Sequence, residues 1–238
     1  MMTGKGKVFL VPTIIADNTQ SLVIPQQSRN VLPGIRHFVV EEVRTARRFL
    51  SSLKIFESIE SLHFSVLDKN TREDEIAAML APALEGNPMA ILSESGCPGV
   101  ADPGALAVNY CHRAGIKVVP LVGPSSLLLG LMASGLNGQK FAFHGYLPIE
   151  QRELSQAIKM LELESRKNAQ SQIMIETPYR NNQVLKALLQ TLSPQTELCV
   201  AQDITGIDEL IVTKRVSQWR LQSIEMHKKP AVFIFLAH

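Results

Sequence analysis

Residues 90–104 read AILSESGCPGVADPG, an apolar run that stops at Ser93 and gives way to a loop of Ser, Gly, Pro and Asp. A helical pattern over 105–114 follows. A strand that leads through a Gly/Pro loop into a helix is typical of open parallel sheets, which bind ligands beyond the carboxyl ends of their strands. Such connections usually span only a few residues, and this one runs to about ten. Its length favours a ligand-binding loop over a plain connection, and Gly96 and Gly99 would let the backbone approach that ligand closely.

Residues 118–136, VVPLVGPSSLLLGLMASGL, repeat this arrangement. A buried-strand run over 116–121 meets a Gly-Pro-Ser-Ser turn, and a helical pattern follows. Pro124 is suited to a helix start, and Ser125 or Ser126 can cap the free N–H groups of that helix. The same N–H groups could instead hold a carboxylate or hydroxyl of a ligand. The turn is therefore either an ordinary helix cap or a second part of a ligand site.

The composition is that of a globular chain with one large or two small cores: 238 residues, 45% hydrophobic and 19% charged. The net charge of +2 permits an anionic partner without requiring one. The three cysteines are odd in number and lack a Cys-x-x-Cys spacing. This argues against a disulfide framework and a zinc site, and it favours a reducing compartment, the cytoplasm. The tract 118–136 is too interrupted by Gly, Pro and Ser to cross a membrane as a helix, so no membrane association is expected.

Strand-like and helix-like runs alternate along the chain, which indicates α/β architecture. Strands are expected at 7–12, 36–40, 62–66, 88–93 and 116–121, then near 140–145, 171–176, 196–202, 207–213 and 230–236. Helices are expected at 72–85 and near 124–134, 150–164, 181–192 and 217–226. One apolar stripe along 181–192 predicts a core-facing helix, and the unbroken AVFIFLA run over 231–237 predicts a central strand covered on both faces. No domain boundary is visible in these patterns.

Further short motifs follow the first two in a fixed order. They read SESGCPGVADPG at 93–104, VPLVGPSS at 119–126, ASGL at 133–136, FHGYLP at 143–148 and ETPYR at 176–180. Their order and spacing resemble the tetrapyrrole methylase superfamily of S-adenosylmethionine-dependent methyltransferases. The nearest resemblance is to its ribosomal small-subunit RNA (cytidine-2′-O)-methyltransferase branch. That branch carries patterns close to S-D-A-G-T-P-x-I-S-D-P-G, V-P-L-P-G-x-S-A, A-S-G-L, F-x-G-F-L-P and E-S-P-H-R, and the resemblance covers nearly the whole chain.

This resemblance implies two α/β domains of the tetrapyrrole methylase type, with S-adenosylmethionine in the cleft between them. It places the join near 121, with a mostly parallel sheet in an N-terminal domain over 1–121 and a mixed sheet in a C-terminal domain over 122–238. The cofactor-binding residues that it implies are Gly96, Cys97, Pro98, Val100, Ser125, Ser126, Glu176, Pro230 and Ala231. Cys97 stands where the superfamily often has Asp. We interpret it as a small residue in a tight turn, because no basic neighbour would lower the pKa of its thiol.

A ribose hydroxyl is a poor nucleophile unless a base accepts its proton. The candidate bases are Glu41, Glu42, Glu176, Asp203 and Glu209. We take Glu41, Glu176 and Glu209 as the catalytic candidates.

The stretch VEEVRTARRFL over 40–50 is similar to the branch's A-E-D-T-R-x-T-R-K-L-L, in which acidic and basic groups face the substrate. Arg44, Arg47 and Arg48 fall at i, i+3 and i+4, on one helical face that could hold phosphates. The alternative is a solvated basic face. With Arg180 of the ETPYR motif, these arginines are the substrate-binding candidates.

Three departures from the branch lie toward the expected substrate side. Ile14 and Ala16 stand where the branch has Pro and Gly. The stretch QDITGIDE at 202–209 replaces R-E-L-T-K-x-x-E and lacks its Arg and Lys, and ETPYR at 176–180 replaces E-S-P-H-R. The cofactor motifs are better kept, so methyl transfer is better supported than any particular RNA position.

The resemblance therefore implies a methyltransferase that uses S-adenosylmethionine and acts on a ribose 2′-hydroxyl of ribosomal RNA. Its partners would be ribosomal RNA or the small ribosomal subunit, and its assembly a homodimer. Two alternatives stay open: methylation of a corrin or porphyrin-like macrocycle, and a degenerate paralogue that binds the cofactor without catalysis. A Rossmann dinucleotide enzyme is discounted because no G-x-G-x-x-G follows the first strand. Methyl transfer needs no metal, and no metal site is expected.

Overall fold

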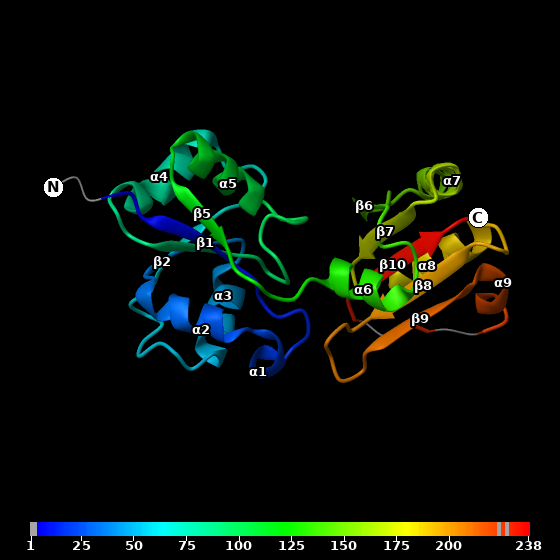
Figure 1. Ribbon diagram of the computed structural model, residues 1–238, viewed down its shortest axis with the longest axis horizontal. Helices are drawn as coiled ribbons and strands as arrows, with labels where there is room; N and C mark the ends of the chain where they lie inside the picture. Colours follow the sequence, from blue (N-terminus) through cyan, green and yellow to red (C-terminus); the bar gives the residue numbers. More distant parts are fainter. Residues whose placement is uncertain (1–3, 223–224, 227–228) are drawn as a thin grey trace. The chain divides into compact units, whose positions relative to one another are not determined.

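The computed structural model describes residues 4–222, 225–226 and 229–238. The chain divides into two compact units, residues 1–125 and 126–238, each built on its own five-stranded sheet (Figure 1). Helices and strands alternate in both units, so the α/β prediction is confirmed. Within the described part of the chain, none of the helices combines the length and hydrophobicity that a membrane span requires.

The first unit has a fully parallel sheet. Its strands are β1 (Lys7–Val11), β2 (His37–Val40), β3 (His63–Val66), β4 (Met89–Leu92) and β5 (Lys117–Pro120), in the order β3-β2-β4-β1-β5. Alternate residues of each strand enter different cores. Phe38 and Leu92 belong to one, and Val39 and Ile91 belong to the other. A parallel sheet covered on both faces explains why its strands read as continuous apolar runs.

Helices cover both faces of this sheet. They are α1 (Gln20–Val23), α2 (Gln26–Val31), a 3₁₀ turn (Leu32–Gly34), α3 (Val43–Ser52), α4 (Glu73–Leu84) and α5 (Gly104–Arg113). Phe49 and Leu50 of α3 pack in the first core, and Leu80 of α4 and Cys111 of α5 pack in the second. The expected helix 72–85 is confirmed, whereas α1 and α2 are too short to show helical periodicity in the sequence.

The second unit has a mixed sheet. Its strands are β6 (Phe141–Tyr146), β7 (Ser171–Glu176), β8 (Glu197–Gln202), β9 (Leu210–Arg215) and β10 (Ala231–Leu236), in the order β6-β7-β10-β8-β9. Strands β6 and β7 run parallel, and the pairs of β10 with β7 and β8, and of β8 with β9, are antiparallel. Strand β10 lies at the centre and is buried along nearly its whole length, as its unbroken apolar run predicts.

The helices of the second unit are α6 (Ser126–Ser134), α7 (Gln151–Asn168), α8 (Asn181–Thr191) and α9 (Val216–Trp219). Leu154 of α7 and Leu188 of α8 pack with Phe233 in one core. Leu131 of α6 packs with Ile234 in a second core on the other face of the sheet. The stripe expected along 181–192 is therefore a core face.

The helix expected over 217–226 is wrong beyond Trp219. The guanidinium of Arg220 donates to the carbonyls of Leu189 and Leu192 at 2.7 and 2.9 Å. The amides of the next two residues bond three residues back, as in a turn. Tertiary hydrogen bonds therefore end the helix, and residues 223–224 lie outside the described part. The strand expected over 207–213 likewise begins only at Leu210.

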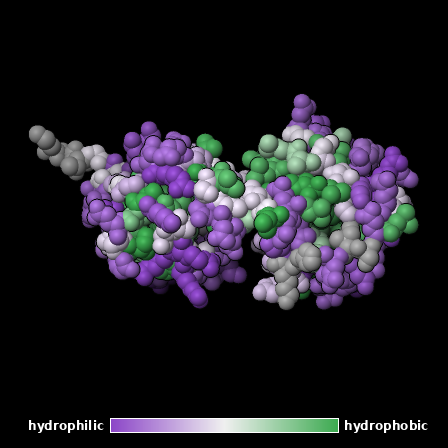
Figure 2. All heavy atoms as spheres, turned by 90° about the horizontal axis from the view of Figure 1, so that it is seen from below, coloured by the Kyte–Doolittle hydropathy of each residue, from purple (hydrophilic) through white to green (hydrophobic). Residues whose placement is uncertain are grey.

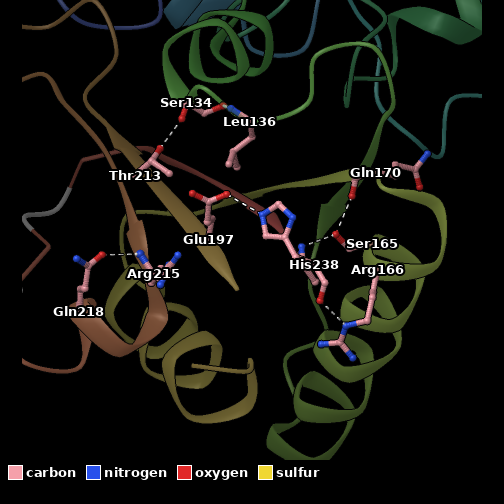
Figure 3. Close-up of polar contacts among 11 residues, drawn as sticks. Ser134, Leu136, Ser165, Arg166, Gln170, Glu197, Thr213, Arg215, Gln218 and His238 are labelled. Carbon is pink, nitrogen blue, oxygen red and sulfur yellow. Dashed lines mark hydrogen bonds and ion pairs between the residues drawn. The ribbon is translucent and has the colours of Figure 1, made fainter. Parts of the chain in front are cut away.

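Contacts among separate elements hold the last residues of the second unit in place (Figure 3). The backbone N–H of Ala237 donates to Ser165 Oγ at 2.9 Å, and Arg166 Nε donates to the carbonyl of His238 at 2.9 Å. The His238 ring lies 2.9 Å from Glu197 Oε2 on β8. These contacts tie the end of β10 to α7 and to the start of β8.

Candidate functional site

The loop after β4 is tied to the end of β1. The backbone N–H of Thr13 donates to the carbonyl of Gly96 at 2.9 Å, and Thr13 Oγ1 donates to the carbonyl of Ser93 at 3.2 Å. Ser93 Oγ donates to the same Gly96 carbonyl at 2.7 Å. Gly96 and Gly99 have φ values of 75° and 81°, a region that favours glycine. The loop is thus held in one backbone conformation, while Val100 within it is 46% exposed.

The loop after β5 closely approaches the loops after β1 and β4. A Cβ atom on Gly123 would lie 2.4 Å from Cβ of Pro12, so only glycine permits this approach. Cys97 Sγ donates to the carbonyl of Pro124 at 3.4 Å. Burial raises the pKa of the Cys97 thiol, which stays protonated at neutral pH, as befits a small residue in a tight turn. Three strand ends therefore meet on one edge of the first sheet.

Two carboxyl groups meet at this same edge. Asp102, in the loop after β4, accepts hydrogen bonds at Oδ1 from the backbone N–H groups of Gly99 and Gly104, at 2.6 and 2.7 Å. Glu41 follows β2, which pairs directly with β4. Its carboxyl group lies within hydrogen-bonding reach of the Asp102 side chain. Asp102 Oδ2 is buried and finds no other donor among the described residues, so a proton on Glu41 satisfies both groups.

This environment raises the pKa of Glu41 to about 7, first through burial and then through the charges of Asp102 and Glu94. A hydrogen bond from the backbone N–H of Glu94 partly opposes the rise. Burial raises the pKa of Asp102 as well, but the amides of Gly99 and Gly104 stabilise its charged form. The shared proton therefore belongs mainly on Glu41. A carboxyl group that titrates near neutral pH at the edge of a sheet is suited to general-base chemistry.

Helix α3 begins beside this pair. Glu42 caps it by accepting the backbone N–H groups of Arg44 and Thr45 at 2.8 and 2.7 Å, and these hydrogen bonds lower the pKa of Glu42. Glu42 is thus a helix cap with a weakened capacity as a base. The predicted arginines Arg44, Arg47 and Arg48 are all exposed on α3. Arg47 lies over the Phe64 ring, with 5.5 Å from its guanidinium carbon to the ring centroid.

In the second unit, three strand ends line up in register. Ala231, the first residue of β10, pairs with Glu176 at the end of β7 and with Gln202 at the end of β8. The preceding segment is held from both sides: Asn181 Nδ2 donates to the carbonyl of Lys229 at 2.6 Å, and the backbone N–H of Asp203 donates to the carbonyl of Pro230 at 3.1 Å. The structure therefore brings the predicted residues Glu176, Pro230 and Ala231 together at one edge of this sheet.

Glu176 and Arg180 form a buried ion pair. Arg180 Nη1 lies 3.1 Å from Glu176 Oε2, and the Glu176 side chain is only 1% exposed. Glu176 Oε1 accepts the backbone N–H of Thr177 at 2.7 Å. Arg180 Nη2 donates to the carbonyl of Pro148 at 2.9 Å. Arg180 therefore links the loop after β6 to the loop after β7, and both side chains have partners within the protein.

The loop between β8 and β9 centres on Asp203. Lys229 Nζ lies 3.1 Å from Asp203 Oδ2, and this hydrogen bond raises the pKa of Lys229. Asp203 has a φ of 50°, and its Oδ2 also accepts the backbone N–H of Asp208 at 3.1 Å. Glu209, by contrast, is exposed, and its Oε2 accepts the backbone N–H of Thr205 at 2.7 Å. Sequence reasoning missed Lys229, which has no spacing signal in the chain.

The predicted cofactor-binding residues of the first unit lie together in the loops after β4 and β5. A Cβ atom on Gly96 would lie 3.6 Å from the Pro124 carbonyl oxygen, an ordinary contact, so the φ of 75° is what favours glycine at this position. Exposed Val100 offers an apolar surface beside it. Ser125 ends the first unit and Ser126 is the first residue of α6. Within the first unit the structure thus brings together Gly96, Cys97, Pro98, Val100 and Ser125. Sequence reasoning did not predict the contact between Asp102 and Glu41, because that contact depends on the order of the strands in the sheet.

Comparisons with known proteins identify the family to which the chain is similar. The family of Tetrapyrrole (Corrin/Porphyrin) Methylases matches residues 22–219. Ribosomal RNA small subunit methyltransferase I of Vibrio cholerae is 32% identical over 87% of this chain and 68% of that protein. Its namesake in Escherichia coli O157:H7 is 28% identical over 99% of this chain and 79% of that protein.

A similar fold is found in uroporphyrin-III C-methyl transferase from Thermus thermophilus, solved in complex with S-adenosyl homocysteine. It has a TM-score of 0.54 at 17% identity and covers 97% of each chain. The family match and the relatives together confirm the resemblance seen in the motifs. The chain belongs to the tetrapyrrole (corrin/porphyrin) methylases and is an S-adenosylmethionine-dependent methyltransferase.

Proposed function

We propose that this methyltransferase transfers a methyl group to a ribose 2′-hydroxyl of ribosomal RNA in the small ribosomal subunit. The observation that carries the proposal is the similarity, over most of the chain, to proteins named ribosomal RNA small subunit methyltransferase I. The carboxyl pair at the edge of the first sheet supports it, because a ribose hydroxyl needs a base to accept its proton.

Glu41 is the base in this proposal. S-adenosylmethionine supplies an activated methyl group when bound. As the ribose oxygen gains that methyl group, its hydroxyl loses a proton, and the Glu41 carboxylate accepts it. A pKa of about 7 leaves a substantial fraction of Glu41 ionised near neutral pH and able to take the proton.

The other two catalytic candidates are less suited to this role. Glu176 is buried and ion-paired with Arg180, so its carboxylate is already neutralised by a fixed partner. Glu209 is exposed and accepts a backbone hydrogen bond within its own loop. We assign Glu176 the role of positioning Arg180 and the loop at the end of β7. Glu209 is the second candidate for the base.

The cofactor-binding residues in this proposal come from both units: Gly96, Cys97, Pro98, Val100 and Ser125 from the first, and Ser126, Glu176, Pro230 and Ala231 from the second. Support comes from the glycine conformations of the loop after β4 and from the alignment of Ala231 with Glu176. In-line methyl transfer depends on aligning the acceptor and excluding water, which rigid loops of this kind can do.

The acceptor side is formed by Arg44, Arg47 and Arg48 on α3. They are exposed cations next to Glu41 in the chain, and phosphate contacts dominate RNA affinity. Arg180 is mostly buried in its contacts with Glu176 and Pro148, so we assign it to shaping the loops rather than to direct RNA contact.

The test is transfer of labelled methyl groups from S-adenosylmethionine to small ribosomal subunits that lack the modification. Precorrins and uroporphyrinogen serve as competing acceptors. Label in a ribose of the RNA supports the proposal, and label in a macrocycle replaces it with the corrin or porphyrin alternative. Cofactor binding without transfer to any acceptor would indicate a degenerate paralogue.

A homodimer in the cytoplasm completes the proposal. Hydrophobic side chains gather on the surface of the second unit (Figure 2). The exposed hydrophobic residues of this unit include Leu128 and Met132 of α6, which are 52% and 78% exposed, and Leu210 of β9, which is 40% exposed. Apolar surface of this kind is typical of an interface. Light scattering that reports twice the monomer mass supports the dimer, and a monomer at micromolar concentration contradicts it.

A further inference from the structure

The two residues that lead into β10 are held from both sides within the second unit. The side-chain Nδ2 of Asn181, at the start of α8, donates to the carbonyl of Lys229 at 2.6 Å. The backbone N–H of Asp203, which follows β8, donates to the carbonyl of Pro230 at 3.1 Å. Lys229 Nζ also lies 3.1 Å from Asp203 Oδ2. Two successive carbonyls and one side chain are therefore fixed before the strand begins at Ala231.

Asn181 is a polar residue in a position that packing alone would give to an apolar one. It is completely buried, as are Val184, Leu185 and Leu188 on the same helix. Its Oδ1 atom finds no hydrogen-bond partner among the residues that the structure describes. Burying an unpaired carbonyl costs free energy, so the amide is unfavourable unless its other end serves a purpose. What the amide provides is the hydrogen bond from Nδ2 to the carbonyl of Lys229.

The ion pair of Asp203 and Lys229 depends on a glycine. The Asp203 side chain is 4% exposed, and an added Cβ on Gly206 would lie 2.3 Å from its Oδ2 atom. A side chain at 206 would therefore push the carboxylate away from Lys229. Gly206 stands where the resembling branch has Lys, and here the cation comes from the segment before β10 instead. We call the side chains of Asn181, Asp203 and Lys229 the β10 clamp.

The residue that follows the clamp aligns three strands. Ala231 pairs with Glu176 at the end of β7 and with Gln202 at the end of β8. The rest of β10 is buried between β7 and β8, so loss of the clamp would loosen the start of the strand and leave the sheet in place. A loosened end can misplace a bound ligand without unfolding the domain, and a misplacement of about 1 Å can slow a reaction about 10²-fold.

We propose that the β10 clamp positions the backbone of Pro230 and Ala231 to bind S-adenosylmethionine. The inference rests on the proposed cofactor contacts of Pro230 and Ala231 and adds the side chains that hold those residues ready. The clamp residues act through the backbone that they hold and need not touch the cofactor. Their loss should therefore weaken cofactor binding out of proportion to any loss of stability.

Two adjacent asparagines provide matched variants. Asn182 Oδ1 accepts the backbone N–H of Met226 at 2.8 Å, earlier in the segment that Asn181 holds. Asn181→Leu should weaken S-adenosylhomocysteine binding, measured by calorimetry, roughly tenfold or more. Its free energy of unfolding in urea should not fall, because leucine buries no unpaired carbonyl. Asn182→Leu should keep the wild-type affinity to within about twofold. Wild-type affinity in Asn181→Leu, or an affinity loss matched by an equal loss of stability, would overturn the proposal.

The lysine of the clamp gives a second, independent test. Lys229→Met should also weaken S-adenosylhomocysteine binding, and Lys229→Arg should recover most of the affinity because it keeps a cation beside Asp203. Lys214 is the control, since its Nζ donates to Gln222 Oε1 at 2.9 Å on the surface of the same unit. Lys214→Met should leave the affinity within about twofold of the wild type. Equal affinities of Lys229→Met and Lys214→Met would count against the clamp.

NMR of the wild type separates failure of the clamp from failure of the proposed cofactor contacts. S-adenosylhomocysteine should shift the backbone amide signal of Ala231 and leave that of Gly138, which precedes the opposite end of the sheet, unchanged. If the Ala231 signal does not shift, the proposed contact fails and the inference fails with it. If it shifts while the clamp variants bind normally, the contact stands and the clamp is rejected. None of these measurements uses RNA, so they decide the inference whichever acceptor the enzyme methylates.

Discussion

The carboxyl groups of Glu41 and Asp102 lie within hydrogen-bonding reach of each other beyond the ends of β2 and β4. Asp102 is held by the amides of Gly99 and Gly104, which stabilise its charged form. Glu41 receives less help from backbone amides and more repulsion from its acidic neighbours. The pair therefore keeps one proton up to about neutral pH, and above that pH the Glu41 carboxylate is free to accept a proton from a substrate.

Replacing this base should remove the pH dependence of methyl transfer. In the wild type, kcat/KM for the RNA acceptor should rise with pH and level off above the Glu41 pKa of about 7. Glu41→Gln should lower kcat by about 10² to 10⁴ and flatten the profile, since no carboxylate accepts the proton. The affinity for S-adenosylmethionine, measured by calorimetry, should stay within a few-fold. A variant that keeps the wild-type profile would show that another group is the base.

The same substitution should affect stability in a pH-dependent way. The folded-state pKa of Glu41 is raised above its ordinary value of 4.5, so its contribution to stability is fully present below pH 4.5 and is lost as pH rises through about 7. Glu41→Gln cannot ionise, so above pH 7 it should be more stable than the wild type, by about 1 kcal/mol after allowance for solvent screening. Urea unfolding of the wild type and Glu41→Gln at pH 5 and pH 8.5 compares their stabilities with Glu41 protonated and with Glu41 ionised. A stability difference that does not grow with pH would contradict the shared proton.

Gly96→Val should abolish cofactor binding and leave the fold intact. Gly96 has a φ of 75°, and a side chain there would enter the space in front of the Pro124 carbonyl. The backbone strain alone costs about 1–2 kcal/mol, which a domain of this size tolerates. Gly138→Val is the control, because no atom lies within 4 Å of its added Cβ. Calorimetry with S-adenosylhomocysteine measures cofactor binding, and circular dichroism shows whether the fold is intact. Normal binding by Gly96→Val would mean that the cofactor lies elsewhere.

Replacing Arg44, Arg47 and Arg48 together by Ala should weaken RNA binding and flatten its salt dependence. Each phosphate contact contributes about 0.7–0.9 to the slope of log affinity against log salt, so the loss should reach about 2. Cofactor affinity should stay within a few-fold. A control triple removes the same charge from α7, at the exposed residues Arg152, Lys159 and Lys167. Equal slopes in the two triples would show that the α3 arginines form only a solvated face.

Arg180→Met should destabilise the second unit by about 3 kcal/mol, because it leaves the Glu176 carboxylate buried without its partner. Adding Glu176→Gln should recover most of that loss. The exposed pair of Arg113 and Glu73, at 2.8 Å, is the control, and Arg113→Met should cost less than about 1 kcal/mol. Denaturant unfolding measures the free energy of unfolding of each variant. If Arg180→Met lost RNA binding without losing stability, Arg180 would be a substrate contact after all.

The sequence alone was sufficient for features that depend on neighbours in the chain. The apolar run before Ser93 and the Gly/Pro loop after it predict a strand that leads through a loop into a helix, as β4 and α5 do. The long apolar runs predict β4 and β10, and the stripe along α8 predicts its buried face. These features follow from local periodicity and backbone preference, which a single segment carries by itself. The sequence pattern did not predict α1 and α2, because helices of four and six residues are too short to show a helical period.

Only the tertiary structure decided which distant residues meet. Glu41 and Asp102 come together because β2 lies beside β4 in the order β3-β2-β4-β1-β5. That order cannot be predicted from the sequence of either strand alone. Hydrogen bonds from Arg220 to the end of α8 stop α9 where its sequence pattern would continue. In each case a contact between segments outweighs a local preference worth less than about 1 kcal/mol per residue, because buried hydrogen bonds and charges are costlier to leave unpaired.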